Sequence, residues 1–295
     1  MLPVSCDLPD VPVLAVSMGA RDLRALLHVP ENGKPPVWHP FHQLLLECPA
    51  EKDIWEPAEL CKTLALCRSL PERSGLTVAE KVLVCVPARE YPVAARPCAE
   101  RPCLKPYGLA RSGGLPLAAL MPEKADEEML RLCKIQRITG FPVLNETAAT
   151  ILGLLAAPGV LARSCRQGVT LVDMTENHVL AALVYQERLL GLLELPWEKI
   201  PSGPVGKAVL LDCLEEFRFG WLPDERAREL GGYVDCAALL PPEAEGFRPI
   251  FASGRNAFLL EGCARIMDSP DDSALVACRG LLFGYARLLA STLPG

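Results

Sequence analysis

A short polar loop after an apolar strand carries the first side chains that could do chemistry. The stretch TLVDMTENHVLAALVYQERLLGLLELP has the pattern of short strands joined by tight turns. Its first strand ends on Asp173, and Thr175 and Asn177 lie in the loop before His178. Strand, acid and turn follow one another in this way in phosphate-binding loops, whose backbone N–H groups approach the anion. Such loops are usually rich in glycine, and here none occurs between Asp173 and Gly191.

Each candidate side chain also has a purely structural alternative. Asp173 could ligate a metal or its water, or it could cap the turn by accepting a backbone N–H. His178 could contact a ligand or Asp173, or be a half-buried strand histidine. Asn145 and Glu146 begin the helix in LNETAATILGLL. They could position a water, although asparagine is also a good N-cap and an early glutamate suits the helix dipole.

Two further turns contain candidate binding residues. In LAVSMGARDLRALLH, Ser17, Gly19 and Asp22 lie where one strand turns into the next. In IFASGRNAFLLEGC, a strand reaches Gly254 and Arg255 before a helix. The glycine predicts a positive φ or a close backbone approach. The arginine could be a fork for phosphate or carboxylate, or a solvated residue at the start of the helix.

Composition excludes some classes of function. The chain has 295 residues, of which 50% are hydrophobic and 22% charged, and its formal net charge is −6. Nucleic-acid binding needs a positive face, and no Lys/Arg run supplies one. The first residues lack a basic region, and the longest apolar run, ILGLLAAPGVLA, is short and contains Pro158. We therefore expect a soluble, cytoplasmic protein that binds neither nucleic acid nor membranes.

The cysteines do not have the spacing of a metal site. There are 13, with no C-x-x-C pair and no C-x3-C-x2-C cluster motif. We expect most of them to be buried as small apolar residues, and we expect no iron or zinc site and no iron–sulfur cluster. His39 and His42 lie close together without further ligand candidates nearby, which favours a strand end over a metal site.

The predicted elements form two halves that begin alike. Each half opens with a three-stranded antiparallel meander, and the first contains the hairpin signal Asn32-Gly33. We expect an N-terminal lobe over residues 1–150, with a Pro/Arg-rich loop or insertion near 92–122, and a C-terminal lobe over 151–295. The predicted strands are 13–16, 23–29, one from residue 37, and 82–86; the predicted helices are 57–70, one ending at Gly140, one ending near Gly159, and about 204–219. The last two predictions are a strand, glycine turn and helix over 247–266, and a strand running into a helix over 274–292.

The motif GFPVLNETAATILGLL resembles the NE-x-x-AA linker helix of the actin-like ATPase superfamily, seen in large heat-shock chaperones and sugar kinases. The order of the elements around it is similar as well. A first phosphate hairpin falls at Leu14–His28, a second at Thr170–Leu193, and an adenosine-binding turn at IFASGRNAFLLEGC. The resemblance implies a duplicated actin-like, ribonuclease-H-like α/β fold with two lobes around a cleft. It also implies ATP or ADP with Mg²⁺ as the ligand.

A narrower resemblance is to the family called domain of unknown function 1786, often labelled as a pyruvate formate-lyase activating enzyme. The shared hairpin, VDMTENHVLAALVYQERLLGLLE, matches the family at Asp173, Asn177, His178, Gly191 and Glu194. The chain is a divergent member of this pattern. Ser17 replaces the acid of the first turn, Met174 and Glu176 replace glycines of the second, and the adenosine turn has lost its proline.

Together these features predict a binder of a nucleotide or phosphometabolite with weak or lost ATPase activity. If active, it would be an Mg-dependent ATPase or phosphotransferase, with Asp22, Asp173 and Glu146 as the acids. The residues expected to bind the cofactor are Ser17, Gly19, Thr175, Asn177, His178, Gly254 and Arg255. The alternative is a non-catalytic scaffold that binds an unknown protein partner. Radical activating chemistry is disfavoured because no cluster motif exists.

Overall fold

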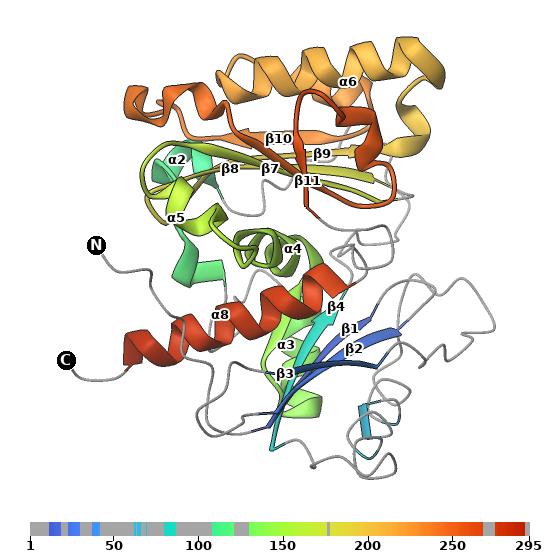
Figure 1. Ribbon diagram of the computed structural model, residues 1–295, viewed down its shortest axis with the longest axis vertical. Coiled ribbons are helices and arrows are strands. Elements are labelled where there is room, and N and C mark those ends of the chain that lie inside the picture. Colours follow the sequence, from blue (N-terminus) through green and yellow to red (C-terminus); the bar gives the residue numbers. More distant parts are fainter. Residues whose placement is uncertain are drawn as a thin grey trace. The chain divides into compact units, whose positions relative to one another are not determined.

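The computed structural model describes residues 12–18, 23–29, 37–41, 62, 64–65, 69, 80–86, 108–120, 130–175, 178–267 and 275–292. The chain forms two compact units that interleave along the sequence. Unit 1 contains Met1–Tyr91, Ala118–Ala156 and Ala274–Gly295, and unit 2 contains Pro92–Leu117 and Ala157–Ser273. In Figure 1, unit 1 therefore includes both the blue strands and the red C-terminal helix.

Unit 1 is built on a sheet with the strand order β3-β2-β1-β4-β6. The first three strands form the expected antiparallel meander, and β4 and β6 run parallel to β1. The first four residues of β1, Val13–Val16, are buried and apolar. The fifth, Ser17, is buried and polar. The strands are β1 (Val13–Met18), β2 (Leu23–Val29), β3 (Val37–Phe41), β4 (Lys81–Val86) and β6 (Val143–Asn145).

The helices of unit 1 are α3 (Leu130–Thr139), α4 (Glu146–Leu155) and α8 (Val276–Thr292). Helices α4 and α8 pack closely together. A Cβ built at Gly280 of α8 would lie only 1.7 Å from the carbonyl oxygen of Ala149 in α4. The domain boundary expected after residue 150 lies inside α4, and α8 belongs to unit 1. The strand predicted at the start of the last element is wrong from Val276 onward, where the chain is helical. This helix packs against both a sheet and another helix, so its apolar run lacks a clear period.

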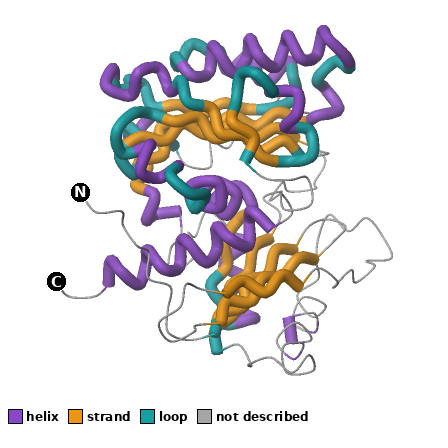
Figure 2. The backbone as a smooth tube through the Cα atoms, viewed as in Figure 1, coloured by secondary structure: helices purple, strands orange, loops and turns teal. Residues whose placement is uncertain are grey.

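Unit 2 has a sheet with the strand order β10-β9-β8-β7-β11-β12, and β5 also pairs with β9. Its first three strands again form an antiparallel meander, followed by the parallel strands β11 and β12. The bounds are β5 (Leu115–Pro116), β7 (Val169–Met174), β8 (His178–Tyr185), β9 (Arg188–Pro196), β10 (Tyr233–Cys236), β11 (Ile250–Ser253) and β12 (Arg265–Ile266). Figure 2 shows these strands in orange with a layer of helices over them.

The two sheets repeat one design. In each, the first strand is central, its meander lies on one side and its parallel partners on the other. The first strands also read alike, VLAVSM in β1 and VTLVDM in β7, so Ser17 and Asp173 occupy the same position. This repeated strand order confirms the predicted duplicated actin-like, ribonuclease-H-like α/β fold.

The main helix of unit 2 covers one face of its sheet. Helix α6 (Gly203–Arg218) buries Leu210, Cys213, Leu214 and Phe217 in a core shared with Val172 and Met174. Because side chains alternate along a strand, Asp173 projects from the opposite face of β7. The other helical elements are α2 (Leu109–Ser112), α5 (Val160–Ser164), α7 (Asp224–Glu229) and the 3-10 turns η2 (Leu117–Leu120), η3 (Trp197–Lys199), η4 (Pro242–Phe247) and η5 (Ala257–Leu260).

The segment near 92–122 was expected to be a loop or an insertion, and the loop alternative is wrong over residues 108–120, which form α2, β5 and η2. Pro92–Leu117 belongs to unit 2, between segments of unit 1. Asp235 of β10 is fully buried and accepts hydrogen bonds from the N–H groups of Leu109 (3.0 Å) and Ala110 (3.2 Å). Arg188 donates to the carbonyl oxygen of Gly114 at 2.8 Å. These contacts are with residues far along the chain, so the local sequence did not indicate them. Within the described ranges, no helix has the length and apolarity needed to cross a membrane.

Candidate functional site

The strongest candidate site of unit 2 lies at the carboxyl ends of two neighbouring parallel strands. Asp173 near the end of β7 is only 6% exposed and is in register with Ser253 at the end of β11. In open α/β sheets, ligands bind outside the carboxyl ends of strands. The structure therefore brings together Asp173, Thr175, His178, Gly254 and Arg255, all predicted as site residues.

Thr175 closes the turn of the second hairpin. Its backbone N–H donates to the carbonyl oxygen of His178 at 3.1 Å, and its Oγ1 accepts from the N–H of His178 at 3.1 Å. The same hydroxyl lies 3.3 Å from Nδ1 of the His178 ring. The imidazole is therefore oriented by the threonine of its own turn.

Gly254 has the two properties expected of it. Its φ is +100°, and a Cβ built there would lie 2.4 Å from the carbonyl oxygen of Met174. The close approach is to the protein's own hairpin. Asn256 strengthens the contact, because its N–H donates to Met174 O at 3.1 Å and its Nδ2 to Thr175 O at 2.8 Å. Asn256 was not identified as a site residue from the sequence, although its place two residues after Gly254 could have indicated it.

The neighbouring Arg255 is exposed, in contrast to the buried Ser253 before it. Its exposure places Arg255 at the surface beside the strand ends. The turn from Ser253 to Asn256 is therefore a rigid contact between β11 and the second hairpin, with a charged side chain at its rim.

Unit 1 has a different chemistry at the equivalent strand ends. Ser17 is 8% exposed and pairs in register with Cys85 of β4, whose thiol it hydrogen-bonds. Burial raises the pKa of the Cys85 thiol well above its ordinary value, and the charge of Glu146 and the proximity of Cys278 raise it further. The Ser17 hydrogen bond lowers it only in part. Cys85 is thus a neutral, inert thiol.

Glu146 and Asn145 lie at the start of α4. Asn145 caps the helix, because its Oδ1 accepts from the N–H of Ala148 at 2.7 Å. Glu146 lies in the first turn, where a negative charge suits the helix dipole. The structural role is confirmed for the asparagine. A role for Glu146 in positioning water stays a prediction.

Some predicted site residues lie outside the described residues: Gly19, Asp22 and Asn177. Within the described ranges, no three His, Cys, Asp or Glu side chains gather into a group that could hold a metal ion by themselves. Among the cysteines whose burial is described, Cys85, Cys213 and Cys278 are buried, as expected of small apolar residues. Cys165 and Cys263 are exposed and Cys236 is partly buried, which differs from that expectation.

The fold defines a class, the duplicated actin-like α/β proteins. No protein-family model and no curated protein matches the chain. Solved structures are similar over most of its length. The Aquifex aeolicus Ppx/GppA phosphatase is 11% identical, with 95% of this chain and 92% of that chain covered at a TM-score of 0.39.

Two other solved structures show a similar likeness. The ethanolamine utilization protein EutJ from Carboxydothermus hydrogenoformans is 12% identical, with coverage of 94% and 90% and a TM-score of 0.41. The ROK hexokinase from Thermus thermophilus is 13% identical, with coverage of 95% and 100% and a TM-score of 0.41. The fold assignment itself rests on the repeated strand order of the two units.

Proposed function

We propose that the protein binds a nucleotide or phosphometabolite and has weak or lost ATPase activity. One observation carries the proposal: the same position of a repeated strand holds a carboxylate in unit 2, Asp173, and a neutral hydroxyl in unit 1, Ser17. One acid that could organise a metal is retained and the other is replaced. Phosphoryl transfer depends on positioning and on metal electrostatics, so losing one acid weakens catalysis more than binding.

The residues of unit 2 fit a nucleotide held with Mg²⁺. Magnesium at phosphates usually keeps several waters and needs one or two carboxylates. Asp173 supplies a buried carboxylate, and Ser253 places a hydroxyl in the neighbouring strand at the same register. Asp173 would hold the hydrated ion, whose charge would neutralise the phosphates, while Arg255 lies beside the same strand ends. If active, the protein is an Mg-dependent ATPase or phosphotransferase.

The test is ligand-induced stabilisation together with phosphate release. A ligand at 100 times its dissociation constant stabilises the native state by about 2.7 kcal/mol, or about 5 °C in melting temperature. Millimolar Mg-ATP or Mg-ADP should produce such a shift, and Asp173→Asn should remove most of it. Asp212→Asn, which changes an exposed acid of α6, is the matched control and should leave the shift intact.

Phosphate release should stay near the background of the buffer. Ser17→Asp should raise it, whereas the neutral control Ser17→Asn should not. Rapid hydrolysis by the unaltered chain, abolished by Asp173→Asn, would show a working ATPase and refute the lost activity. A shift that Asp173→Asn leaves unchanged would refute the site.

A second candidate function is a non-catalytic scaffold that binds a protein partner. The observation in its favour is that the backbone N–H groups of Thr175 and Asn256 already donate within the protein. Backbone donors at these turns would otherwise be the groups that approach a phosphate. Absence of stabilisation by any Mg-nucleotide or phosphorylated metabolite would favour this function.

A further inference from the structure

An exposed aromatic patch lies where α6 ends in unit 2. Trp221 is 70% exposed and stacks on Phe219, with ring centroids 4.7 Å apart. A Cβ at the intervening Gly220 would lie 3.3 Å from Cδ1 of Leu240, and the adjacent Leu239 is 88% exposed. We call Phe219, Trp221, Leu239 and Leu240 the aromatic patch.

The backbone beneath the aromatic patch is fixed by a Schellman turn. Gly220 has φ +70° and its N–H donates to the carbonyl oxygen of Phe217 at 3.0 Å. The N–H of Trp221 donates to the carbonyl oxygen of Glu216 at 2.8 Å. These are the two hydrogen bonds of that helix-ending motif. Trp221 is therefore held in place before any partner arrives, which lowers the entropy cost of binding.

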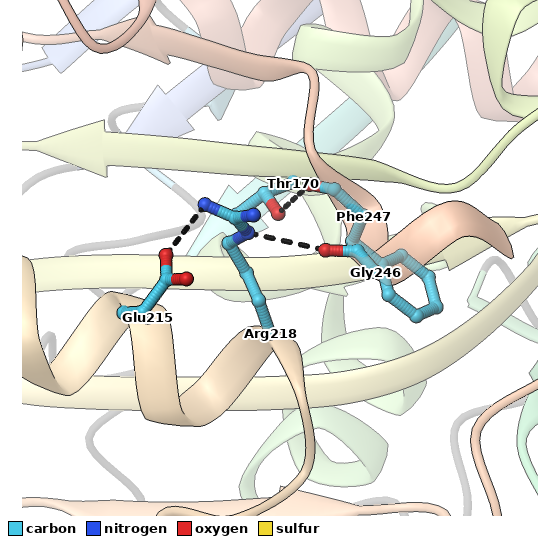
Figure 3. Close-up of polar contacts among 5 residues, drawn as sticks. All are labelled: Thr170, Glu215, Arg218, Gly246 and Phe247. Carbon is cyan, nitrogen blue, oxygen red and sulfur yellow. Dashed lines mark hydrogen bonds and ion pairs between the residues drawn. The ribbon is translucent and has the colours of Figure 1, made fainter.

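A strained turn lies behind the aromatic patch. Glu245, Gly246 and Phe247 are consecutive left-handed residues, with φ of 52°, 66° and 52°. Arg218 Nε donates to the carbonyl oxygen of Gly246 at 3.2 Å, and Thr170 Oγ1 donates to that of Phe247 at 2.8 Å (Figure 3). Left-handed non-glycine residues cost on the order of 1–3 kcal/mol each and persist only where the surroundings impose them. Here they fix the backbone that carries Glu245.

The strained turn places acidic side chains beside the aromatic patch. A Cβ at Gly246 would lie 3.0 Å from the ring of Phe219, so Glu245 adjoins the patch and Glu243 lies two residues before it. Both are exposed, and neither forms an ion pair with any residue of the described ranges. Glu215 is 58% exposed, but its charge is offset by the ion pair with Arg218 at 2.9 Å, so the acidic rim consists of Glu243 and Glu245.

We infer that the aromatic patch and its acidic rim form a docking surface for a basic segment of a partner protein. An Arg or Lys of that segment stacks on Trp221, and neighbouring cations face Glu243 and Glu245. Cation–π contacts are strongest with tryptophan, and Trp and Arg dominate the binding energy of protein interfaces. The indole N–H of Trp221 makes no hydrogen bond to a described residue and is available to a partner carbonyl. Phe219 of this stack already has such a contact, since the guanidinium of Arg218 lies 5.9 Å from the centroid of its ring.

The probe is a short fluorescein-labelled peptide of alternating Arg and Leu, titrated with the intact chain by fluorescence anisotropy. Its acidic counterpart, alternating Glu and Leu, is the matched control and should not bind. Trp221→Ala should weaken binding about tenfold or more, equivalent to at least about 1.4 kcal/mol. The double variant Glu243→Gln, Glu245→Gln should weaken it several-fold and flatten its salt dependence.

Controls separate this surface from general stickiness. Phe258→Ala removes another exposed aromatic of unit 2, 57% exposed, and should leave affinity unchanged. Trp221→Phe keeps an aromatic face and should give an intermediate affinity. Equal binding of both peptides, or unchanged affinity in Trp221→Ala, overturns the inference. Self-association abolished by Trp221→Ala would assign the surface to a second copy of the chain and also overturns it. These results do not depend on whether the protein binds a nucleotide.

Discussion

At the scale of single residues, one strand position decides the chemistry of each unit. Asp173 and Ser17 share that position, and each faces its parallel neighbour, Ser253 or Cys85. The carboxylate in unit 2 is in register with Ser253, whereas the hydroxyl in unit 1 hydrogen-bonds a buried thiol with a raised pKa. The same backbone position thus carries an acidic side chain in unit 2 and an uncharged side chain in unit 1.

Gly254→Ala should destabilise the protein strongly. An alanine would have to adopt the positive φ of Gly254, and its Cβ would lie 2.4 Å from the carbonyl oxygen of Met174. Strain and overpacking together should lower the free energy of unfolding by roughly 2–4 kcal/mol, measured by urea denaturation. Gly262→Ala is the matched control, because its φ is +86° with no atom within 4 Å of the added Cβ. It should cost only about 1–2 kcal/mol; equal losses would contradict the backbone contact at Gly254.

Cys85 should make stability depend on alkaline pH. Its pKa in the folded protein is raised above the ordinary value of 9.0. Below that value both states keep the proton and the thiol contributes no pH dependence. Above it the unfolded thiol ionises while the folded thiol does not, so the free energy of unfolding falls as pH rises, by up to about 1.4 kcal/mol per pH unit.

The measurement compares urea unfolding of the parent chain and Cys85→Ala between pH 8 and 10. The variant should lose stability less steeply over this range, whatever its stability at pH 8. Parallel curves would mean that the thiol ionises as readily in the folded protein as in the unfolded chain.

At the scale of elements, the start of one short helix, α2, is held by a side chain from elsewhere in the chain. Helix α2 has only four residues and begins at Gly108, which offers no side-chain cap. Asp235, more than a hundred residues away, accepts from its first two N–H groups. A helix of this length is not stable alone, because nucleation is costly. Its presence therefore depends on β10.

Asp235→Ala should release α2 from the sheet of unit 2. Two N–H groups would lose a charged acceptor, which should cost roughly 2–3 kcal/mol. Hydrogen exchange should increase at residues 108–117, and limited proteolysis should cut there first. Asp224→Ala, at the start of α7, is the control and should leave that segment protected. Unchanged exchange at 108–117 in Asp235→Ala would show that β5 pairing alone holds the segment.

At the scale of the whole molecule, each unit has its own sheet and buried core. Unit 1 takes residues from three parts of the chain, and its last helix, α8, packs on α4 and on β1, β2 and β4. The close approach of Gly280 to Ala149 and Gly153 leaves no room for a side chain. The C-terminal helix therefore stabilises a unit whose first strand lies at the other end of the sequence.

Gly280→Ala should loosen unit 1 selectively. The added Cβ would lie 1.7 Å from the carbonyl oxygen of Ala149, so the two helices must separate. Hydrogen exchange should rise in β1, β4 and α4, whereas β7, β8 and β9 keep their protection. Gly254→Ala provides the reciprocal case, with the loss confined to unit 2. Loss of protection in both sheets from either substitution would contradict two separate cores.

The sequence alone determined most strands and the longer helices. The strand over Leu23–Val29 and the helix ending before Gly140 agree with the structure, as do both meanders. Alternation, apolar periodicity and glycine at turns act over a few residues, so they can be read without knowing the fold. The positive φ and close backbone approach at Gly254 were predictable for the same reason.

Only the tertiary structure decided which surfaces meet. It placed α8 in unit 1, formed α2 and β5 in an expected loop, and identified Met174 as the backbone beside Gly254. It also paired Ser17 with Cys85 and placed Phe219 against the turn of Glu245. Local patterns say which side of an element is apolar, but many distant faces can cover it. The choice among them is made by packing and hydrogen bonds between residues far apart in the chain.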